Sequence, residues 1–225
     1  MEFLRAALTV AWKDLRVELR SKEVFNAALS FALVILLLFS FAFDPTGEQT
    51  REMSGGLLWL VFAFAGILVL NRSFARETVN DCLDGLLAAP VSGAAIFFGK
   101  LLVNAALLVL LELVCLPVFG IFYNVPWVNI FTRLLPVFAL GTWGLTVIGT
   151  VFSALTVNVR LRELMLPLLV FPVALPALMA SVQLTTALFS GEPLAGEAVW
   201  FRVLAGFDLI FTLLGLALVE TVLVG

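Results

Sequence analysis

Six apolar runs, each about as long as a membrane-spanning helix, constrain the fold of this chain more than any other feature. They cover residues 24–43, 53–71, 94–119, 134–157, 164–189 and 203–224. A helix needs about 20 apolar residues to cross the hydrocarbon core of a bilayer. Because 62% of the 225 residues are hydrophobic and only 13% are charged, a water-soluble domain could not bury them all. We therefore expect an all-α integral membrane protein, with six transmembrane helices in a single domain, 1–225, and not a barrel of short alternating strands.

The basic residues predict the orientation of the bundle. If the N-terminus is cytoplasmic, ten Lys and Arg residues fall on the cytoplasmic side, and only Arg51, Arg133 and Arg202 fall on the other side. Cytoplasmic loops of membrane proteins carry an excess of Lys and Arg. We therefore expect both termini in the cytoplasm, together with the charged loop between the second and third runs (residues 72–93).

The N-terminal segment, residues 1–23, predicts an amphipathic elbow helix ahead of the first span. Its apolar residues recur at helical spacing: Phe3, Leu4, Leu8, Ala11, Trp12, Leu15 and Leu19. The basic residues of the segment fall mostly on the other side. This pattern is typical of a helix that lies in the membrane interface. Such a helix either anchors the topology or also touches a soluble partner.

The charged loop contains a second amphipathic pattern. Val79, Cys82, Leu83, Leu86 and Leu87 form a helical stripe, and the acidic residues lie mainly off it. This pattern predicts a short helix over 76–89 with an exposed polar side. We expect another protein to contact it through Arg76, Glu77, Val79, Asp81, Leu83 and Asp84. The alternative is a surface helix that rests on the bundle or on lipid.

The residue inventory argues against an enzyme. The chain has no histidine, which removes the commonest metal ligand and the commonest acid–base group. Cys82 and Cys115 form no CxxC unit, and Gly99–Leu101 lacks the pattern of a phosphate-binding loop. We therefore expect no catalytic residue, no metal and no cofactor on this chain. Any ATP that it uses must be bound by another chain.

Two acidic residues, Glu112 and Asp208, lie well inside the apolar runs. An ionisable group within a membrane span is costly and is a candidate for function. For Asp208, the simpler interpretation is a structural pair with Arg202 or Arg133. For Glu112, structural hydrogen bonding and a functional role both stay open. Lys100, near the start of the third run, is expected to snorkel to the surface.

Four segments carry a resemblance to a known family. They are "AWKDLRVELRSKE" (11–23), "FARETVNDCLDGLLAAPVSGAAIFFGK" (74–100), "LRELMLPLLVFPVALPA" (161–177) and "FDLIFTLLGLALVE" (207–220). Over essentially its whole length, the chain resembles the cytochrome c maturation protein B family, also called haem exporter protein B. The stretch over 74–100 is the most specific of the four.

That resemblance implies an ABC-2-like exporter permease in the bacterial inner membrane, with two copies per complex. The implied partners are a separate ATP-binding subunit, a haem-handling membrane subunit, a small membrane subunit and a periplasmic haem chaperone, and no nucleic acid. ATP would be held by the ATP-binding subunit and haem by the other partners. The implied function is to couple ATP hydrolysis to haem delivery or to release of the haem-loaded chaperone. The helix over 76–89 would then sit in a groove of the ATP-binding subunit.

Other functions stay open from the residues alone. A six-span ABC permease for a lipid or a drug would have the same architecture. A secondary transporter, an ion channel or a passive assembly factor belongs to a different class, and the chain shows no internal repeat of the kind that secondary transporters carry. Co-purification with an ATPase would favour the two ABC interpretations.

Overall fold

The computed structural model describes residues 2–43, 47–77, 91–157, 159, 161–191 and 194–224. Within these ranges the chain forms seven α-helices and one short 3-10 helix, and it has no strand. Six of the helices are long and apolar enough to cross a membrane, judged by length and composition. The prediction of an all-α membrane protein with six spans is therefore confirmed for the described part of the chain.

The helices follow one another in the order that the apolar runs predict. They are α1 (Glu2–Ser21), α2 (Glu23–Ala42), α3 (Glu48–Asn71), α5 (Gly93–Phe122), α6 (Trp127–Leu155), α7 (Arg162–Ser190), the 3-10 helix η2 (Leu194–Glu197) and α8 (Ala198–Val224). Every span starts earlier than its run. The differences are largest for α6, which starts at Trp127 instead of residue 134, and for α3 and α8, which start at Glu48 and Ala198 instead of residues 53 and 203. The added turns of α6 and α8 are rich in Trp, Phe and Arg, which suit the membrane interface.

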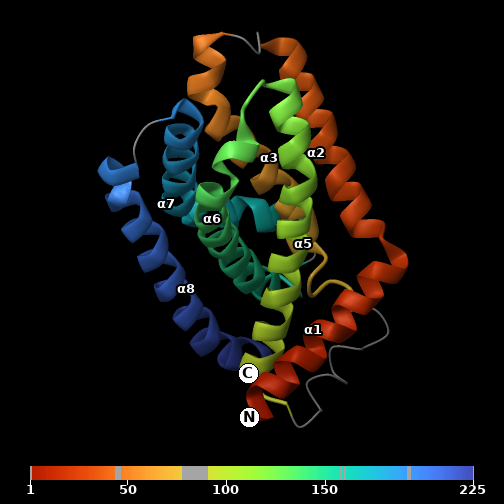
Figure 1. The fold of residues 1–225 in the computed structure, drawn as a ribbon. Coiled ribbons are helices and arrows are strands. Elements are labelled where there is room, and N and C mark those ends of the chain that lie inside the picture. Colours follow the sequence, from red (N-terminus) through yellow and green to blue (C-terminus); the bar gives the residue numbers. More distant parts are fainter. Residues whose placement is uncertain are drawn as a thin grey trace.

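The spans α3 and α6 lie at the centre of the bundle, and α2 and α8 lie at its periphery (Figure 1). Both central helices pack against α7 and α5, and α6 also packs along α8. Trp59, Phe62 and Phe138 form an aromatic cluster between α3 and α6, with ring centroids 5.6–5.8 Å apart. The apolar outer faces of α2 and α8 are left for lipid or for other membrane chains.

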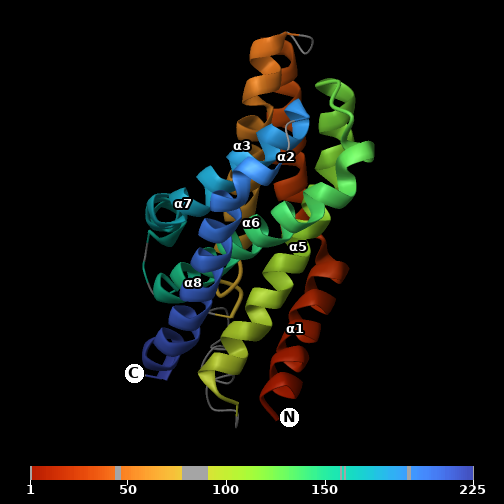
Figure 2. The same ribbon diagram turned by 60° about the vertical axis from the view of Figure 1, so that its left-hand side comes forward.

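The N-terminal amphipathic helix is confirmed as α1, which packs along the N-terminal half of α5 (Figure 2). Lys22, with a left-handed φ of 54°, separates α1 from α2 and makes the bend between them. A Cβ on Gly99 would lie 2.6 Å from the carbonyl oxygen of Ala7, so only glycine permits this close approach. The fold thus holds α1 directly against the start of the third span.

Candidate functional site

The described part of the charged loop, residues 72–77, folds back against α1 and α5. Phe74 is fully buried and belongs to the same apolar cluster as Ile96 and Phe97 of α5. The backbone N–H of Glu77 donates to the carbonyl oxygen of Phe74 at 3.0 Å. The buried Phe74 ring therefore fixes where the charged side chains beside it can point.

Two of the residues predicted to contact a partner, Arg76 and Glu77, lie in this described part. The other four lie outside the described residues: Val79, Asp81, Leu83 and Asp84. Most of the helix predicted over 76–89 lies outside them as well. The contact role of all six stays a prediction. The structure does show what Arg76 and Glu77 touch within the chain itself.

Glu77 belongs to a ring of four side chains with alternating charges, which come from three segments of the chain. Its Oε1 lies 2.6 Å from Nζ of Lys13 on α1 and 3.0 Å from Nζ of Lys100 on α5. The carboxylate of Asp14 closes the ring, at 3.0 Å from Lys100 and 3.1 Å from Lys13. Each lysine thus contacts both carboxylates, and the ring ties the loop to α1 and α5.

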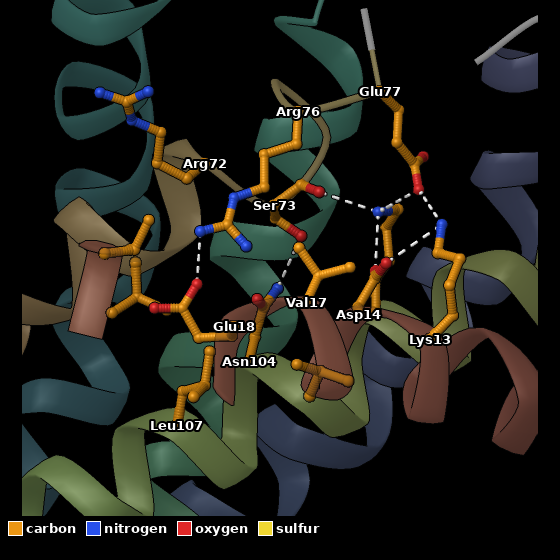
Figure 3. A pocket seen from close by; sticks show the side chains of 14 residues that line it. Lys13, Asp14, Val17, Glu18, Arg72, Ser73, Arg76, Glu77, Asn104 and Leu107 are labelled. Atoms are coloured by element: carbon orange, nitrogen blue, oxygen red, sulfur yellow. Dashed lines mark hydrogen bonds and ion pairs between the residues drawn. The ribbon is translucent and has the colours of Figure 1, made fainter. Parts of the chain in front are cut away.

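Arg76 and Glu18 form a second ion pair beside this ring (Figure 3). Glu18 is buried near the end of α1, and its other oxygen, Oε1, accepts from the backbone N–H of Phe25 at 2.9 Å. Phe25 lies in the first turn of α2. Glu18 therefore connects the loop, α1 and the first span at one point. We refer to the six charged residues as the charged joint: Lys13, Asp14, Glu18, Arg76, Glu77 and Lys100.

The expectation that Lys100 snorkels to the surface is wrong, because this side chain is 1% exposed. Besides its two carboxylate partners, its Nζ donates to the carbonyl oxygen of Ser73 at 2.8 Å and lies 4.8 Å from the centroid of the Phe74 ring. A buried ammonium group is tolerated only when such partners replace its water. Lys100 has enough partners inside the fold that it does not need the surface.

A neutral side chain extends the joint toward α6. Asn104 on α5, one turn beyond Lys100, donates to Oγ of Ser73 and to Oγ1 of Thr150, each at 2.9 Å. Thr150 lies on α6 and is fully buried. The loop is therefore linked through α5 to the central span of the bundle.

Glu77 was expected on an exposed polar side, and this expectation is also wrong. The residue is 6% exposed, and Oε1 is fully engaged with the two lysines. Its other oxygen, Oε2, is buried and has no hydrogen-bond partner among the described residues. A charge reversal at Glu77 would therefore disturb the fold itself, so it cannot serve as a probe of a surface contact.

The charges around Lys13 keep it protonated. Partial burial lowers the pKa of Lys13, but the hydrogen bond to Glu77 and the attraction of Asp14 and Glu77 outweigh it, so the net pKa is raised above its ordinary value. A lysine with a raised pKa is fully charged at neutral pH. Lys13 therefore contributes a positive charge to the ring at neutral pH.

The joint is suited to holding helices and not to chemistry. A cavity of about 250 Å³ beside it is lined by acidic and basic side chains that pair with one another. No group of three or more His, Cys, Asp or Glu residues that could hold a metal occurs in the described part of the chain. Carboxylates that each contact two lysines hold the three segments together.

The two intramembrane acids both contact α6, from different sides. Glu112 on α5 accepts a hydrogen bond from Oγ1 of Thr142. Asp208 on α8 does not form the expected pair with Arg202 or Arg133, and its two oxygens are buried without any partner in the described ranges. Both arginines are exposed, and six residues along a helix place Arg202 on a different face from Asp208.

Sequence reasoning missed four members of the joint: Lys13, Asp14, Glu18 and Lys100. One signal was available, since Asp14 and Glu18 are four residues apart and share a helix face with Ala7 and Ala11. Acidic residues on the side of an amphipathic helix that packs indicate a buried basic partner. The expected apolar side of α1 is split in the structure, because Leu4, Leu8, Trp12 and Leu19 are exposed.

These features define a class: a six-span helical membrane protein whose N-terminal helix is locked by buried ion pairs to the loop after its second span. Known proteins match this chain in sequence. Heme exporter protein B of Rhodobacter capsulatus is 33% identical over 186 residues, which cover 80% of this chain and 81% of that protein. Heme exporter protein B of Pseudomonas aeruginosa is 28% identical over 197 residues, 86% of each chain.

A family model described as CcmB protein matches residues 5–223, nearly the whole chain. A third relative, heme exporter protein B of Paracoccus denitrificans, is 31% identical over 166 residues, 74% of this chain and 76% of that protein. The chain belongs to the CcmB protein family.

Proposed function

We propose that this chain is the permease subunit of an ABC-type complex that acts in cytochrome c maturation. In this proposal, a separate ATP-binding subunit hydrolyses ATP, and this chain converts that motion into haem delivery or release of a haem-loaded periplasmic chaperone. The names of the curated relatives, heme exporter protein B, support the link to haem export. The observation that carries the coupling role is the charged joint.

The joint supplies a mechanical route from the charged loop into the bundle. Any partner that moves the chain beyond Glu77 also pulls on Lys13 and Lys100, and Arg76 pulls on Glu18. Removing one partner of a buried ion pair costs on the order of 3–5 kcal/mol, so the buried members of the joint resist separation from their partners. A small displacement of the loop is therefore passed to α1, α2 and α5 together instead of being lost in a flexible connection.

The proposed orientation places the joint where ATP is available. The excess of Lys and Arg on the side of the N-terminus favours cytoplasmic termini in a bacterial inner membrane. The charged loop then faces the cytoplasm, as do α1 and the start of α5. These segments offer the ATP-binding subunit a single connected surface.

The proposed division of labour leaves chemistry to the partners. ATP belongs on the ATP-binding subunit, and haem on a haem-handling membrane subunit and the periplasmic chaperone, with a small membrane subunit completing the complex. Two copies of this chain per complex match the paired closure of ATP-binding subunits. The absence of histidine from the sequence supports a non-catalytic subunit that holds neither haem nor metal.

Affinity purification from native membranes in mild detergent, followed by identification of the bound chains, tests the proposal. We expect an ATP-binding subunit and a haem-containing membrane chain to co-purify. A strain without this chain should make no holocytochrome c. Two results together would instead indicate an ABC permease for another substrate, such as a lipid or a drug. They are an ATP-binding subunit that co-purifies with this chain, and normal holocytochrome c in the strain that lacks it. Recovery of no ATPase would contradict the ABC role.

A further inference from the structure

We infer that Asp208 is a proton-binding site within the membrane domain, and that the bound proton allows α8 to pack against α6. The inference goes beyond the proposed function, since neither haem handling nor ATP coupling assigns a role to this residue. Asp208 lies in the middle of α8 and is 7% exposed. Its position, its missing partners and its contact with Gly144 carry the inference.

Both carboxyl oxygens of Asp208 are enclosed by the chain itself. Each is buried and without a hydrogen-bond partner among the described residues. Two polar side chains that line the same groove as Asp208 pair with each other, since Nε1 of Trp143 donates to Oγ1 of Thr212 at 3.0 Å. A bare carboxylate enclosed in this way would lack both water and a counter-charge, and it would be unstable in the membrane.

The helices packed on α8 bring no cation to Asp208. These are α5, α6, α7 and η2. Their described ionisable residues are Lys100, Glu112, Cys115, Arg133, Arg162, Glu163 and Glu197, and α8 itself adds Arg202. None of them forms an ion pair or a hydrogen bond with Asp208. With no cation in place, a proton is the ligand that neutralises the group without requiring space.

Gly144 on α6 shows how closely the carboxyl group is held. A Cβ at this position would lie 2.8 Å from Oδ1 of Asp208 and 3.4 Å from Cβ of Ala177. The carboxyl group therefore fills the gap that a glycine leaves on α6. Both oxygens are buried against α6, so a proton fits this packing, whereas a partner's basic side chain would require α6 and α8 to separate.

The same geometry indicates what releasing the proton would require. Asp208 itself lines a groove between α6 and α8, together with Leu140, Trp143, Leu209 and Thr212. Its two carboxyl oxygens are buried, and a slight separation of the two helices at Gly144 would open them to this groove. The charged form of Asp208 therefore favours a looser α6–α8 contact, and the protonated form favours the packed one.

Infrared spectroscopy of the purified complex at neutral pH tests the inference. The spectrum of the Asp208→Asn variant is subtracted from that of the natural complex. Asn keeps the size of the neutral acid, so we expect this variant to assemble normally. The difference should contain the carbonyl stretch of one protonated carboxylic acid, lost in the variant. The Glu112→Gln variant is the matched control and should retain that band.

Two results would overturn the inference. One is a difference spectrum in which Asp208→Asn loses a carboxylate band and no carboxylic acid band, because Asp208 would then be ionised. The other is loss of the assigned acid band in Glu112→Gln instead of Asp208→Asn. Failure of the proposed function is separable, because it is measured as holocytochrome c and co-purified ATPase and does not depend on this band.

Discussion

Arg76 and Glu18 form an ion pair that joins the loop after the second span to the end of the N-terminal helix. Glu18 is buried and Arg76 is partly exposed. They are 58 residues apart in the chain. Because Glu18 also accepts from the backbone of Phe25, the pair fixes the loop against both α1 and α2. The stability of this end of the bundle, and the coupling proposed for it, should both depend on the pair.

Reversing one member of this pair should weaken the fold, and exchanging both should restore part of the loss. Removing a partner from a buried pair costs about 3–5 kcal/mol, and because Arg76 is 32% exposed we expect Arg76→Glu to cost less than this. Glu18→Arg also loses the bond to Phe25, so the double exchange should recover only part of the stability. Thermal unfolding in detergent measures all three variants. Equal stability of Arg76→Glu and the natural chain would show that the ion pair contributes nothing to the stability of the fold.

Replacing Lys100 should be among the most harmful single changes in the half of the bundle that carries the charged joint. Lys100→Met leaves Asp14 and Glu77 sharing only Lys13, and we expect a loss of about 3–5 kcal/mol or a failure to accumulate in the membrane. Arg16→Met is the control. Arg16 is exposed on α1, the helix that carries Lys13, Asp14 and Glu18 of the joint, and surface changes usually stay within about 0.5 kcal/mol. Fluorescence-detected size exclusion measures both. A stable Lys100→Met variant would contradict the structural importance of the joint.

A side chain at position 99 should separate α1 from α5. In Gly99→Val the new Cβ would meet the Ala7 carbonyl at 2.6 Å, and backbone cannot yield as a flexible side chain does. We expect a cysteine at Val10, which is 6% exposed in the natural chain, to become reactive toward a thiol reagent. Gly206→Ala is the control, since nothing lies within 4 Å of the added Cβ. Unchanged protection of position 10 in Gly99→Val would refute the close packing.

Thiol labelling from the periplasm tests the proposed orientation. Ser190 and Ser92 are both exposed and lie at opposite ends of the bundle. In a background without Cys82 and Cys115, Ser190→Cys should react with an impermeant reagent in intact spheroplasts. Ser92→Cys should react only after the membrane is opened. The reverse pattern would place the charged joint outside the cell, where no ATP-binding subunit can reach it.

The six spans could be predicted from the sequence because membrane crossing depends on length and composition within one segment. Helix ends could not, since α6 continues through the interfacial residues before 134 that a search for apolar runs leaves out. Trp127 and Phe131 pack edge to face there, with ring centroids 6.1 Å apart. A turn that is stable in the headgroup region needs no hydrophobic run.

The charged joint could not be predicted because it depends on which helices become neighbours. Helical periodicity places Glu77 off the apolar stripe of its own loop, but its partners Lys13 and Lys100 come from other helices, and Lys13 is 64 residues away. A polar residue is buried when a distant segment supplies its counter-charge. The same reasoning applies to Asp208, where the sequence offered Arg202 as a partner and the fold turns that side chain away.

The central claim is that the charged joint passes motion from an ATP-binding partner into the bundle. The most direct test measures ATP hydrolysis and holocytochrome c production together, for complexes that carry Arg76→Glu alone or with Glu18→Arg. We expect Arg76→Glu to lower the holocytochrome c made per ATP hydrolysed by at least about tenfold, the change that roughly 1.4 kcal/mol of lost coupling produces, and the double exchange to recover part of it. Normal holocytochrome c in Arg76→Glu, at an unchanged membrane level, would contradict the claim.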